Sequence, residues 1–415
     1  MDRRGFLRVV GGAALTPFVG GLLSACGAPP GTKTSDGGAD GVGGGGGTRK
    51  VRLGFIALTD CASVVMAKEL GYFAERDLDV TVEKQANWAA TRDNLLTGEI
   101  DGAHCLFGMP FSVATGIGGN RSTDLRIAMM LNNNGQAITL NKDFASVGYG
   151  DLAKAKAALA AKTPTLAMTF PGGTHDLWLR YWLKAAKVDE KALKIITIPP
   201  PQMVANMKVG AMDGYCVGEP WGAVAAREGI GFTHLNTQDI WKHHPEKALV
   251  VNQKFATERG EVLQDLMAAV LKASAWLEDK TNLAKASEVI GGPAYVNAPA
   301  TEIAGRLGGT YDLGVGLGER TYDEDYMRFS REGLVNAPRR AHAIWFMAQY
   351  RRLGLLAEDP PFQQLADTLI LRGAYEQAAE AAQVAVPDDD MAPFNVRLDE
   401  ATFDPTDPQE EVKRP

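Results

Sequence analysis

The chain has 415 residues, a length typical of two or three domains, and a formal net charge of −7 from 43 basic and 50 acidic side chains. Nucleic-acid-binding proteins usually carry a positive charge, so this balance argues against such a partner. Hydrophobic residues make up 45% of the sequence, which excludes a disordered chain, and four cysteines are too few for a disulfide scaffold.

The first 25 residues are predicted to be an export signal. Arg3 and Arg4 are followed by Phe-Leu and by an apolar run over residues 9–25 that glycines interrupt. That run is too short and too broken for a membrane span, and the paired arginines resemble the twin-arginine signal of proteins exported in a folded state. Residues 23–26 resemble the lipobox of bacterial lipoproteins. We therefore expect Cys26 to carry a lipid and to become the new N-terminus.

Residues 26–48 are predicted to be a flexible tether. The 22 residues after Cys26 include ten glycines, together with Pro, Ser, Thr and Asp, and contain no apolar run. A lipid followed by such a tether would hold a folded body on the cell membrane, facing the periplasm or the cell exterior.

From residue 49 onward, predicted strands and helices alternate, which is typical of an α/β fold. The first unit has predicted strands at 51–57, 78–83 and 101–106, helices at 62–75 and 89–96, and a further strand at 126–131. The second unit repeats this order with strands at 165–170, 194–198 and 213–217 and helices at 176–187 and 203–209. We therefore predict two lobes of similar plan, with a ligand cleft at the strand ends between them.

The predicted boundaries divide the body into three segments and a tail. Residues 49–145 would form the first part of lobe 1 and residues 146–235 lobe 2. Residues 236–387 would return to lobe 1 and add helices at 261–277 and 341–352. The last segment, 388–415, has nine acidic and three basic residues, so we expect an extended tail on the surface.

Two strand-to-helix loops supply candidate ligand contacts. The glycines of residues 171–176 would let the backbone approach an anion or a carbonyl oxygen at a helix N-terminus, with Asp176 as the N-cap, although a purely structural turn explains them equally well. Trp88 and Ala89 lie in the equivalent loop of lobe 1. The Trp88 indole could offer a hydrogen-bond donor to a pocket or simply fill the core.

Further candidates follow the later strands. Turn chemistry explains the asparagines of residues 132–134 but not Gln136, whose amide could bind an anion. Glu219 and Pro220 end the last strand of lobe 2. Lys247, in the next connection, would be either a solvated lysine or a buried counter-charge to an anion.

The sequence offers no local signature of catalysis or of a cofactor. The glycine loop lacks both GxGxxG and the Walker lysine, and no residue has the pattern of a nucleophile with its base. Cys61, Cys105 and Cys216 have apolar neighbours and no metal-binding spacing, so we expect small buried side chains there. We therefore predict no catalytic residue, no metal and no cofactor.

Together these segments resemble the nitrate/bicarbonate-binding family of ABC-transporter solute receptors, and most closely its nitrate-binding members. The resemblance runs from about residue 51 to residue 408. The motifs that carry it lie at residues 85–94, 170–183, 206–214, 217–221 and 244–247.

The resemblance implies an α/β, two-lobed periplasmic-binding fold of type II that closes on one small anion. The implied ligand contacts are Trp88, the backbone of Ala89, Gln136, His175 and Lys247, with Gly173, Thr174, Glu219 and Pro220 in a second tier. Bicarbonate-binding relatives have an acidic residue where Lys247 stands and recruit calcium through it, so Lys247 favours nitrate or nitrite without a metal. Ala90 departs from the hydroxyl residue that the family would place nearby.

The expected function is therefore extracytoplasmic binding of nitrate or nitrite and its delivery to an ABC permease and its ATPase, without enzymatic activity. Alternatives are a receptor for bicarbonate or for another small anion or organic solute, and a cytoplasmic nitrate sensor of the same fold. A further alternative is an exported enzyme related to pyrimidine-precursor synthases. The export signal argues against the sensor, and the missing cofactor motif argues against the enzyme.

Overall fold

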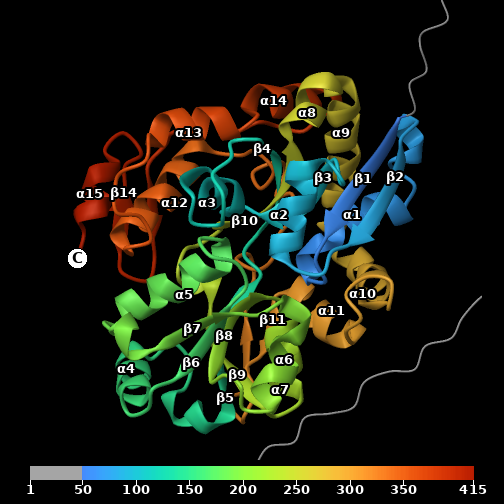
Figure 1. Ribbon diagram of the computed structural model, residues 1–415. Coiled ribbons are helices and arrows are strands. Elements are labelled where there is room, and N and C mark those ends of the chain that lie inside the picture. Colours follow the sequence, from blue (N-terminus) through green and yellow to red (C-terminus); the bar gives the residue numbers. More distant parts are fainter. Residues whose placement is uncertain (1–48) are drawn as a thin grey trace, which may run out of the picture. The chain divides into compact units, whose positions relative to one another are not determined.

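The computed structural model describes residues 49–415, so Arg3, Arg4, Cys26 and the predicted signal and tether lie outside the described residues. Two five-stranded mixed sheets organise the described residues into an upper and a lower lobe in Figure 1. The predicted α/β architecture with two lobes is therefore present. No helix within residues 49–415 is long and apolar enough to cross a membrane.

The two sheets share one topology. Lobe 1 has the strand order β2-β1-β3-β10-β4, and lobe 2 has the order β7-β6-β8-β5-β9. In each sheet the first three strands are parallel, and the fourth runs antiparallel to both of its neighbours. The strands of lobe 1 are β1 (Lys50–Phe55), β2 (Asp79–Lys84), β3 (Gly102–Leu106), β4 (Leu125–Asn133) and β10 (Pro245–Asn252). Those of lobe 2 are β5 (Gln136–Asn141), β6 (Thr165–Met168), β7 (Lys194–Thr197), β8 (Gly214–Gly218) and β9 (Gly231–Asn236).

The fourth strand of each sheet carries the chain from one lobe into the other. β5 follows β4 but lies in the second sheet, and β10 follows β9 but lies in the first. The predicted boundary between residues 145 and 146 is thus too late, because the chain crosses at Asn134 and Gly135. Both residues have positive φ, 59° and 90°. The φ of Gly135 favours glycine, and a Cβ there would also displace the flexible end of the Met327 side chain.

Helices cover both sheets (Figure 1). The strands and helices predicted in the two repeating units are present with ends within about two residues, except that α1 ends at Glu69 because Gly71 turns the chain with φ 78°. The helices of the two units are α1 (Ala62–Glu69), α2 (Trp88–Thr97), α3 (Met109–Thr115), α4 (Leu152–Ala160), α5 (Thr174–Ala185), α6 (Met203–Lys208) and α7 (Trp221–Arg227).

Residues 236–387 were predicted to return to lobe 1, but not all of their helices do so. α9 (Gly260–Leu277) packs on α1 as expected, and α12 (Arg340–Arg352) contacts both α3 of lobe 1 and α5 of lobe 2. α11 (Ala300–Gly308) and β11 (Thr310–Asp312) pack on α7 of lobe 2. The remaining elements are α8 (Gln253–Glu258), α10 (Leu283–Gly291), β12 (Glu319–Thr321), α13 (Phe362–Leu369) and α14 (Arg372–Ala381).

The acidic tail is folded, in contrast to the extended tail predicted for residues 388–415. It forms a hairpin of β13 (Phe394–Val396) and β14 (Ala401–Phe403) and the helix α15 (Pro408–Lys413), which packs on α12. Phe394 stacks on Trp241 with ring centroids 4.3 Å apart. Ion pairs with arginines, for example between Arg414 and Asp399, reduce the repulsion among the acidic side chains of the tail. Aromatic packing and ion pairs thus fold a segment whose acidic composition alone predicted an extended tail.

Candidate functional site

Four predicted ligand contacts lie in the interior at the junction of the two lobes. The side chains of Trp88, Gln136, His175 and Lys247 are fully buried. The Trp88 and His175 rings have centroids 6.5 Å apart, and the Lys247 Nζ lies 5.9 Å from the centroid of the Trp88 ring. The structure therefore brings α2, α5 and β10 together at one place.

Gln136 faces the same place from lobe 2. It pairs with Gly218 across the β5–β8 ladder, so the two residues share one face of the sheet. A Cβ on Gly218 would lie 3.2 Å from the Oδ2 of Asp60, which places that face against the carboxylate bound to Lys247. Both the nitrogen and the oxygen of the Gln136 amide are buried without a hydrogen-bond partner.

The N-terminus of α2 positions Trp88 and Ala89. Asn87 is the N-cap, and its Oδ1 accepts a hydrogen bond of 2.9 Å from the N–H of Ala90. The Ala90 amide is thus occupied by the cap, whereas the N–H of Ala89 belongs to the first turn and has no partner within the helix. The Trp88 indole N–H is buried and unpartnered.

His175 is the second residue of α5, and the cap of this helix differs from the prediction. The N-cap is Gly173, because the Asp176 carboxylate instead accepts hydrogen bonds from the N–H of Gly172 and from the Arg180 guanidinium. The Nδ1 of His175 is hydrogen-bonded to the hydroxyl of Thr169. Burial and the nearby Lys247 hold the pKa of His175 well below its ordinary value, so the ring is neutral.

The free Nε2 of His175 can address a ligand. It has no hydrogen-bond partner and lies 3.7 Å from the Oε1 of Glu246. When the Thr169 hydroxyl donates to Nδ1, the single proton of the neutral ring is on Nε2, which can then donate to an anion.

Lys247 is a buried cation held by two carboxylates. Its Nζ donates a 2.7 Å hydrogen bond to Asp60 Oδ2 and a second one to Glu246 Oε1. Burial opposes the ammonium charge, but the two carboxylates outweigh it and raise the pKa of Lys247. Lys247 lies within β10 rather than in a connection. Its buried position excludes the alternative of a solvated surface lysine.

Three charged or titratable residues of this cluster were not predicted to belong to it: Asp60, His104 and Glu246. Asp60 lies in the 3-10 turn Thr59–Cys61, a few residues after the end of β1. A polar residue shortly after a predicted strand could have been predicted to reach the cleft. The other oxygen of Asp60 binds His104 Nε2 at 2.7 Å. Burial alone would raise the pKa of Asp60, but Lys247 and His104 lower it to about 2. His104 had a weaker signal, as one polar residue in the buried strand β3.

The second-tier residues divide into two groups. Thr174 belongs with the cluster, because its hydroxyl donates a 3.3 Å hydrogen bond to Glu246 Oε1. Glu219 is engaged elsewhere: its carboxylate pairs with Arg306 at 3.0 Å and caps the N–H of Ala223. Glu219 and Pro220 thus serve the junction of α7 and α11, and only the backbone of Glu219 faces lobe 1, where its carbonyl accepts from the N–H of Thr59.

The described structure is closed around the cluster. Trp221 of lobe 2 donates a 3.0 Å hydrogen bond to the carbonyl of Ala57 in lobe 1, beside the bond between Thr59 and Glu219. A hollow of about 460 Å³ between the lobes is lined by Ala89 and Arg92 on one side and by Thr169 and Phe170 on the other. Ala89 follows Trp88 and Thr169 is hydrogen-bonded to His175, so this hollow lies next to the buried cluster.

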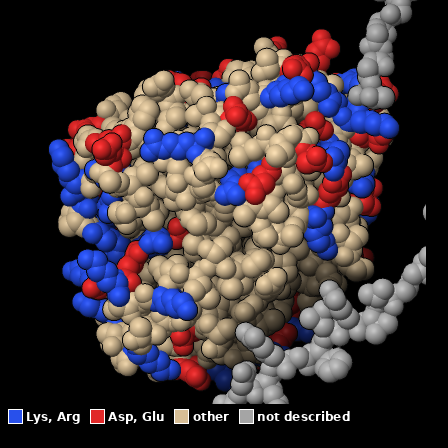
Figure 2. All heavy atoms as spheres, viewed as in Figure 1, with Lys and Arg blue, Asp and Glu red and all other residues tan. Residues whose placement is uncertain are grey.

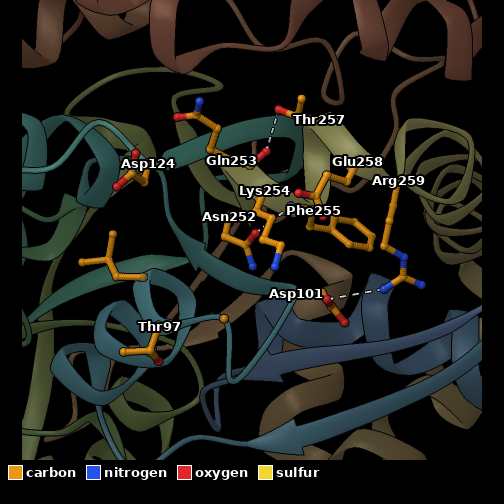
Figure 3. A pocket seen from close by; sticks show the side chains of 12 residues that line it. Thr97, Asp101, Asp124, Asn252, Gln253, Lys254, Phe255, Thr257, Glu258 and Arg259 are labelled. Carbon is orange, nitrogen blue, oxygen red and sulfur yellow. Dashed lines mark hydrogen bonds and ion pairs between the residues drawn. The ribbon is translucent and has the colours of Figure 1, made fainter.

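A second hollow, of about 600 Å³, lies on lobe 1 over α8 (Figure 3). Its polar side chains are exposed to solvent or make local contacts. Arg259 lies 3.5 Å from Asp101, and Asn252 caps α8 through a 2.7 Å hydrogen bond to the N–H of Phe255. None of its lining residues contributes a buried polar atom without a partner, within residues 49–415. This hollow is therefore the weaker candidate despite its size.

Buried donors without acceptors also occur elsewhere, among them the indole N–H groups of Trp182 and Trp345, but at the junction of the lobes they gather beside the ammonium of Lys247. The indole N–H of Trp88, the amide of Gln136 and the Nε2 of His175 are all buried and unpartnered. A buried polar group without a partner costs about 1–3 kcal/mol, so three together indicate a ligand that accepts hydrogen bonds. Cys61, Cys105 and Cys216 are buried and free, and no group of three or more His, Cys, Asp or Glu residues in the described part of the chain could hold a metal.

Comparison with known proteins finds relatives whose names state that they bind a small anion. Residues 44–291 match the NMT1-like family. The nitrate/nitrite binding protein NrtA of a Synechocystis species is 36% identical over 370 residues, covering 86% of this chain and 83% of the relative. NrtA of Synechococcus elongatus is 37% identical over 438 residues, covering 98% and 96%. The crystal structure of the periplasmic nitrate-binding protein NrtA from Synechocystis matches with a TM-score of 0.84 at 34% identity, covering 88% of this chain and 98% of that one.

Proposed function

The chain belongs to the NMT1-like family, and we propose that it is the extracytoplasmic receptor of an ABC transporter for nitrate or nitrite. The observation that carries the proposal is the group of unpartnered buried donors, Trp88, Gln136 and His175, around the ammonium of Lys247. The similarity to NrtA over most of the chain supports the same ligand class.

The donor set suits a small planar oxyanion. Nitrate is univalent and a weak acceptor, so it needs several donors that converge on its oxygens and one opposite charge. The side chains of Trp88, Gln136 and His175 and the N–H of Ala89 supply the donors, and Lys247 supplies the charge. In this proposal the protein binds and releases its ligand unchanged, without a metal.

The transport role places the protein outside the cytoplasm. The proposal includes export through Arg3 and Arg4, a lipid on Cys26, and delivery of the anion to a membrane permease driven by its ATPase. Replacement of Cys26 by Ser should release the protein from the membrane fraction, and protein found in the cytosol without a lipid would favour the sensor instead.

Calorimetry with the purified protein tests the ligand. We expect heat of binding with nitrate or nitrite, and weaker or no binding with bicarbonate, whether or not calcium is present. Binding of bicarbonate only with calcium would favour the alternative receptor, and turnover of a substrate would favour an enzyme.

The Lys247→Ala variant tests the site. Loss of the ammonium leaves the anion without its counter-charge, so we expect the affinity for nitrate to fall at least tenfold. The matched control is Lys254→Ala, which removes an exposed lysine in the hollow over α8. Equal affinities for the two variants would contradict the proposed site.

A further inference from the structure

The buried cluster holds more negative charge than an anion receptor needs. Asp60 and Glu246 are both fully buried carboxylic acids, and Lys247 is the one cation in contact with them among the described residues. His104 and His175 complete the cluster, but burial lowers the pKa of each ring, so neither adds a positive charge at neutral pH.

A bound anion makes this imbalance worse. Two ionised carboxylates and one ammonium sum to one negative charge, and a univalent anion would bring the closed cluster to two. Burial of uncompensated charge is strongly unfavourable, and such groups usually become neutral instead. Either the closed, loaded site takes up a cation, or one of its carboxylates carries a proton.

The contacts of the two carboxylates differ. Both oxygens of Asp60 are engaged, Oδ2 with Lys247 and Oδ1 with His104, at 2.7 Å each. Glu246 has Oε1 in contact with Lys247 and Thr174, while its buried Oε2 makes no hydrogen bond, although the indole N–H of Trp178 lies near the carboxylate and favours its ionised form. A protonated carboxyl group has an O–H to donate, which an ionised one lacks.

We propose that the anion binds together with one proton, which Glu246 carries as a neutral carboxylic acid. Glu246 is then a specificity-determining residue, because it limits what the closed site can take up to one univalent anion together with one proton. This inference rests on the proposed function and extends it. The proton enters with the ligand or is already on Glu246, and no other bond forms or breaks.

The groups around Glu246 agree with this assignment. Burial and the charge of Asp60 raise the pKa of Glu246 to about 7 although Lys247 lowers it, whereas the pKa of Asp60 stays near 2. Asp60 is thus ionised at neutral pH while Glu246 is close to its midpoint. The titratable groups that face Glu246 from the surrounding elements are Asp60 after β1, His104 on β3, His175 on α5, Cys216 on β8 and Lys247 on β10.

Calorimetric titration of the full chain with nitrate tests the inference. The titrations are run in buffers of different ionisation enthalpy, at pH 6.0 and at pH 8.5, and the slope of heat against ionisation enthalpy gives the protons taken up. We expect uptake close to one at pH 8.5 and less at pH 6.0, where more of Glu246 is already protonated before the ligand binds. Above pH 7 the Kd should rise about tenfold for each pH unit.

The Glu246→Gln variant assigns the proton to one residue. Glutamine keeps the size of the side chain and stays neutral, so we expect it to bind nitrate with no proton uptake and a Kd that is constant from pH 6.0 to 8.5. The matched control, Glu228→Gln, removes an exposed carboxylate on lobe 2 and should behave as the unmodified protein.

The outcomes separate the two proposals. Nitrate binding by the unmodified protein without proton uptake at pH 8.5 overturns the inference and leaves the proposed function intact. Uptake that persists in Glu246→Gln also overturns it, because another group would carry the proton. Absence of nitrate binding at every pH would refute the proposed function. Should Glu246→Gln fail to fold, the titrations of the unmodified protein decide alone.

Discussion

Asp60 forms a buried ion pair with Lys247 and a hydrogen bond with His104, so its removal should affect the stability of the fold as well as binding. The pair is fully buried, with Oδ2 and Nζ 2.7 Å apart. Glu246 still pairs with Lys247 when Asp60 is removed, but one N–H of the ammonium and the Nε2 of His104 then lose their buried partner, at a cost of about 1–3 kcal/mol for each group. We expect Asp60→Ala to lower the free energy of unfolding by about that amount, measured with urea.

The size of this effect is checked by a milder change. Asp60→Asn keeps an acceptor oxygen for Lys247 or His104, so its loss of stability should be smaller than that of Asp60→Ala. Asp93→Ala, which removes an exposed ion pair with Arg92, serves as the control and should cost less than about 1 kcal/mol. If Asp60→Ala proves as mild as this control, the pair contributes little to the fold.

Sequence reasoning reached the polar residues that lie beside turns and helix starts but missed His104 and Glu246, which lie within buried strands. Trp88, Ala89, Gln136 and His175 flank glycines, asparagines or helix starts, where a ligand contact is expected. His104 lies inside β3, whose five residues are all buried, so its sequence context reads as core. Glu246 lies in the motif at residues 244–247, but no role was predicted for it, because its burial depends on how β10 inserts between β3 and β4.

At the scale of elements, the loops before α3 and α5 meet where the two lobes close. Gly108 precedes α3, and the single O–H of Tyr350 on α12 lies within hydrogen-bond distance of the carbonyl oxygens of both Gly108 and Gly172. A Cβ on Gly108 would lie 2.9 Å from the Gly172 oxygen and 3.2 Å from the Thr174 nitrogen. Both are backbone atoms of lobe 2 and cannot turn away as a side chain can.

We therefore expect Gly108→Ala to disfavour the closed form. Gly108 has φ −71°, which alanine adopts without strain, so the substitution should act only where the loops approach. The affinity for nitrate should fall at least tenfold in calorimetry, with little change in thermal stability without ligand. Gly373→Ala has no atom within 4 Å of its Cβ and should leave affinity unchanged. An unaltered Kd in Gly108→Ala would show that the loops separate or yield without cost.

The order of elements was predictable, but the lobe to which some belong was not. The repeated pattern predicted the parallel strands of both units because local periodicity and turn residues specify them. β5 was not predicted as a strand, and its residues were placed in lobe 1, since the asparagines of residues 132–134 indicate a turn but do not show that the chain crosses there into the other sheet. The folded tail was missed for a related reason: its ion pairs, such as Arg340 with Asp390, connect residues 50 positions apart.

For the whole molecule, anion affinity is built inside the closed cleft rather than on the surface. On the face shown in Figure 2, basic and acidic side chains are interspersed over a largely uncharged surface. Such a distribution gives little long-range attraction for an anion. In the proposed site, the ammonium of Lys247 and its surrounding donors would supply the affinity after the ligand has entered.

Entry requires the lobes to separate, because Trp88, Gln136, His175 and Lys247 have no exposed surface in the closed form. Without ligand, three unpartnered donors and an excess carboxylate oppose closure, and a bound anion accepts the donors' hydrogen bonds. We expect small-angle X-ray scattering to give a larger radius of gyration without nitrate than with saturating nitrate. With nitrate, the profile of residues 49–415 should match the closed structure.

Lys247→Ala should not contract at a nitrate concentration that saturates the unmodified protein, whereas Lys254→Ala should. Identical profiles with and without nitrate, in a protein that binds it, would mean that the ligand enters without opening of the lobes.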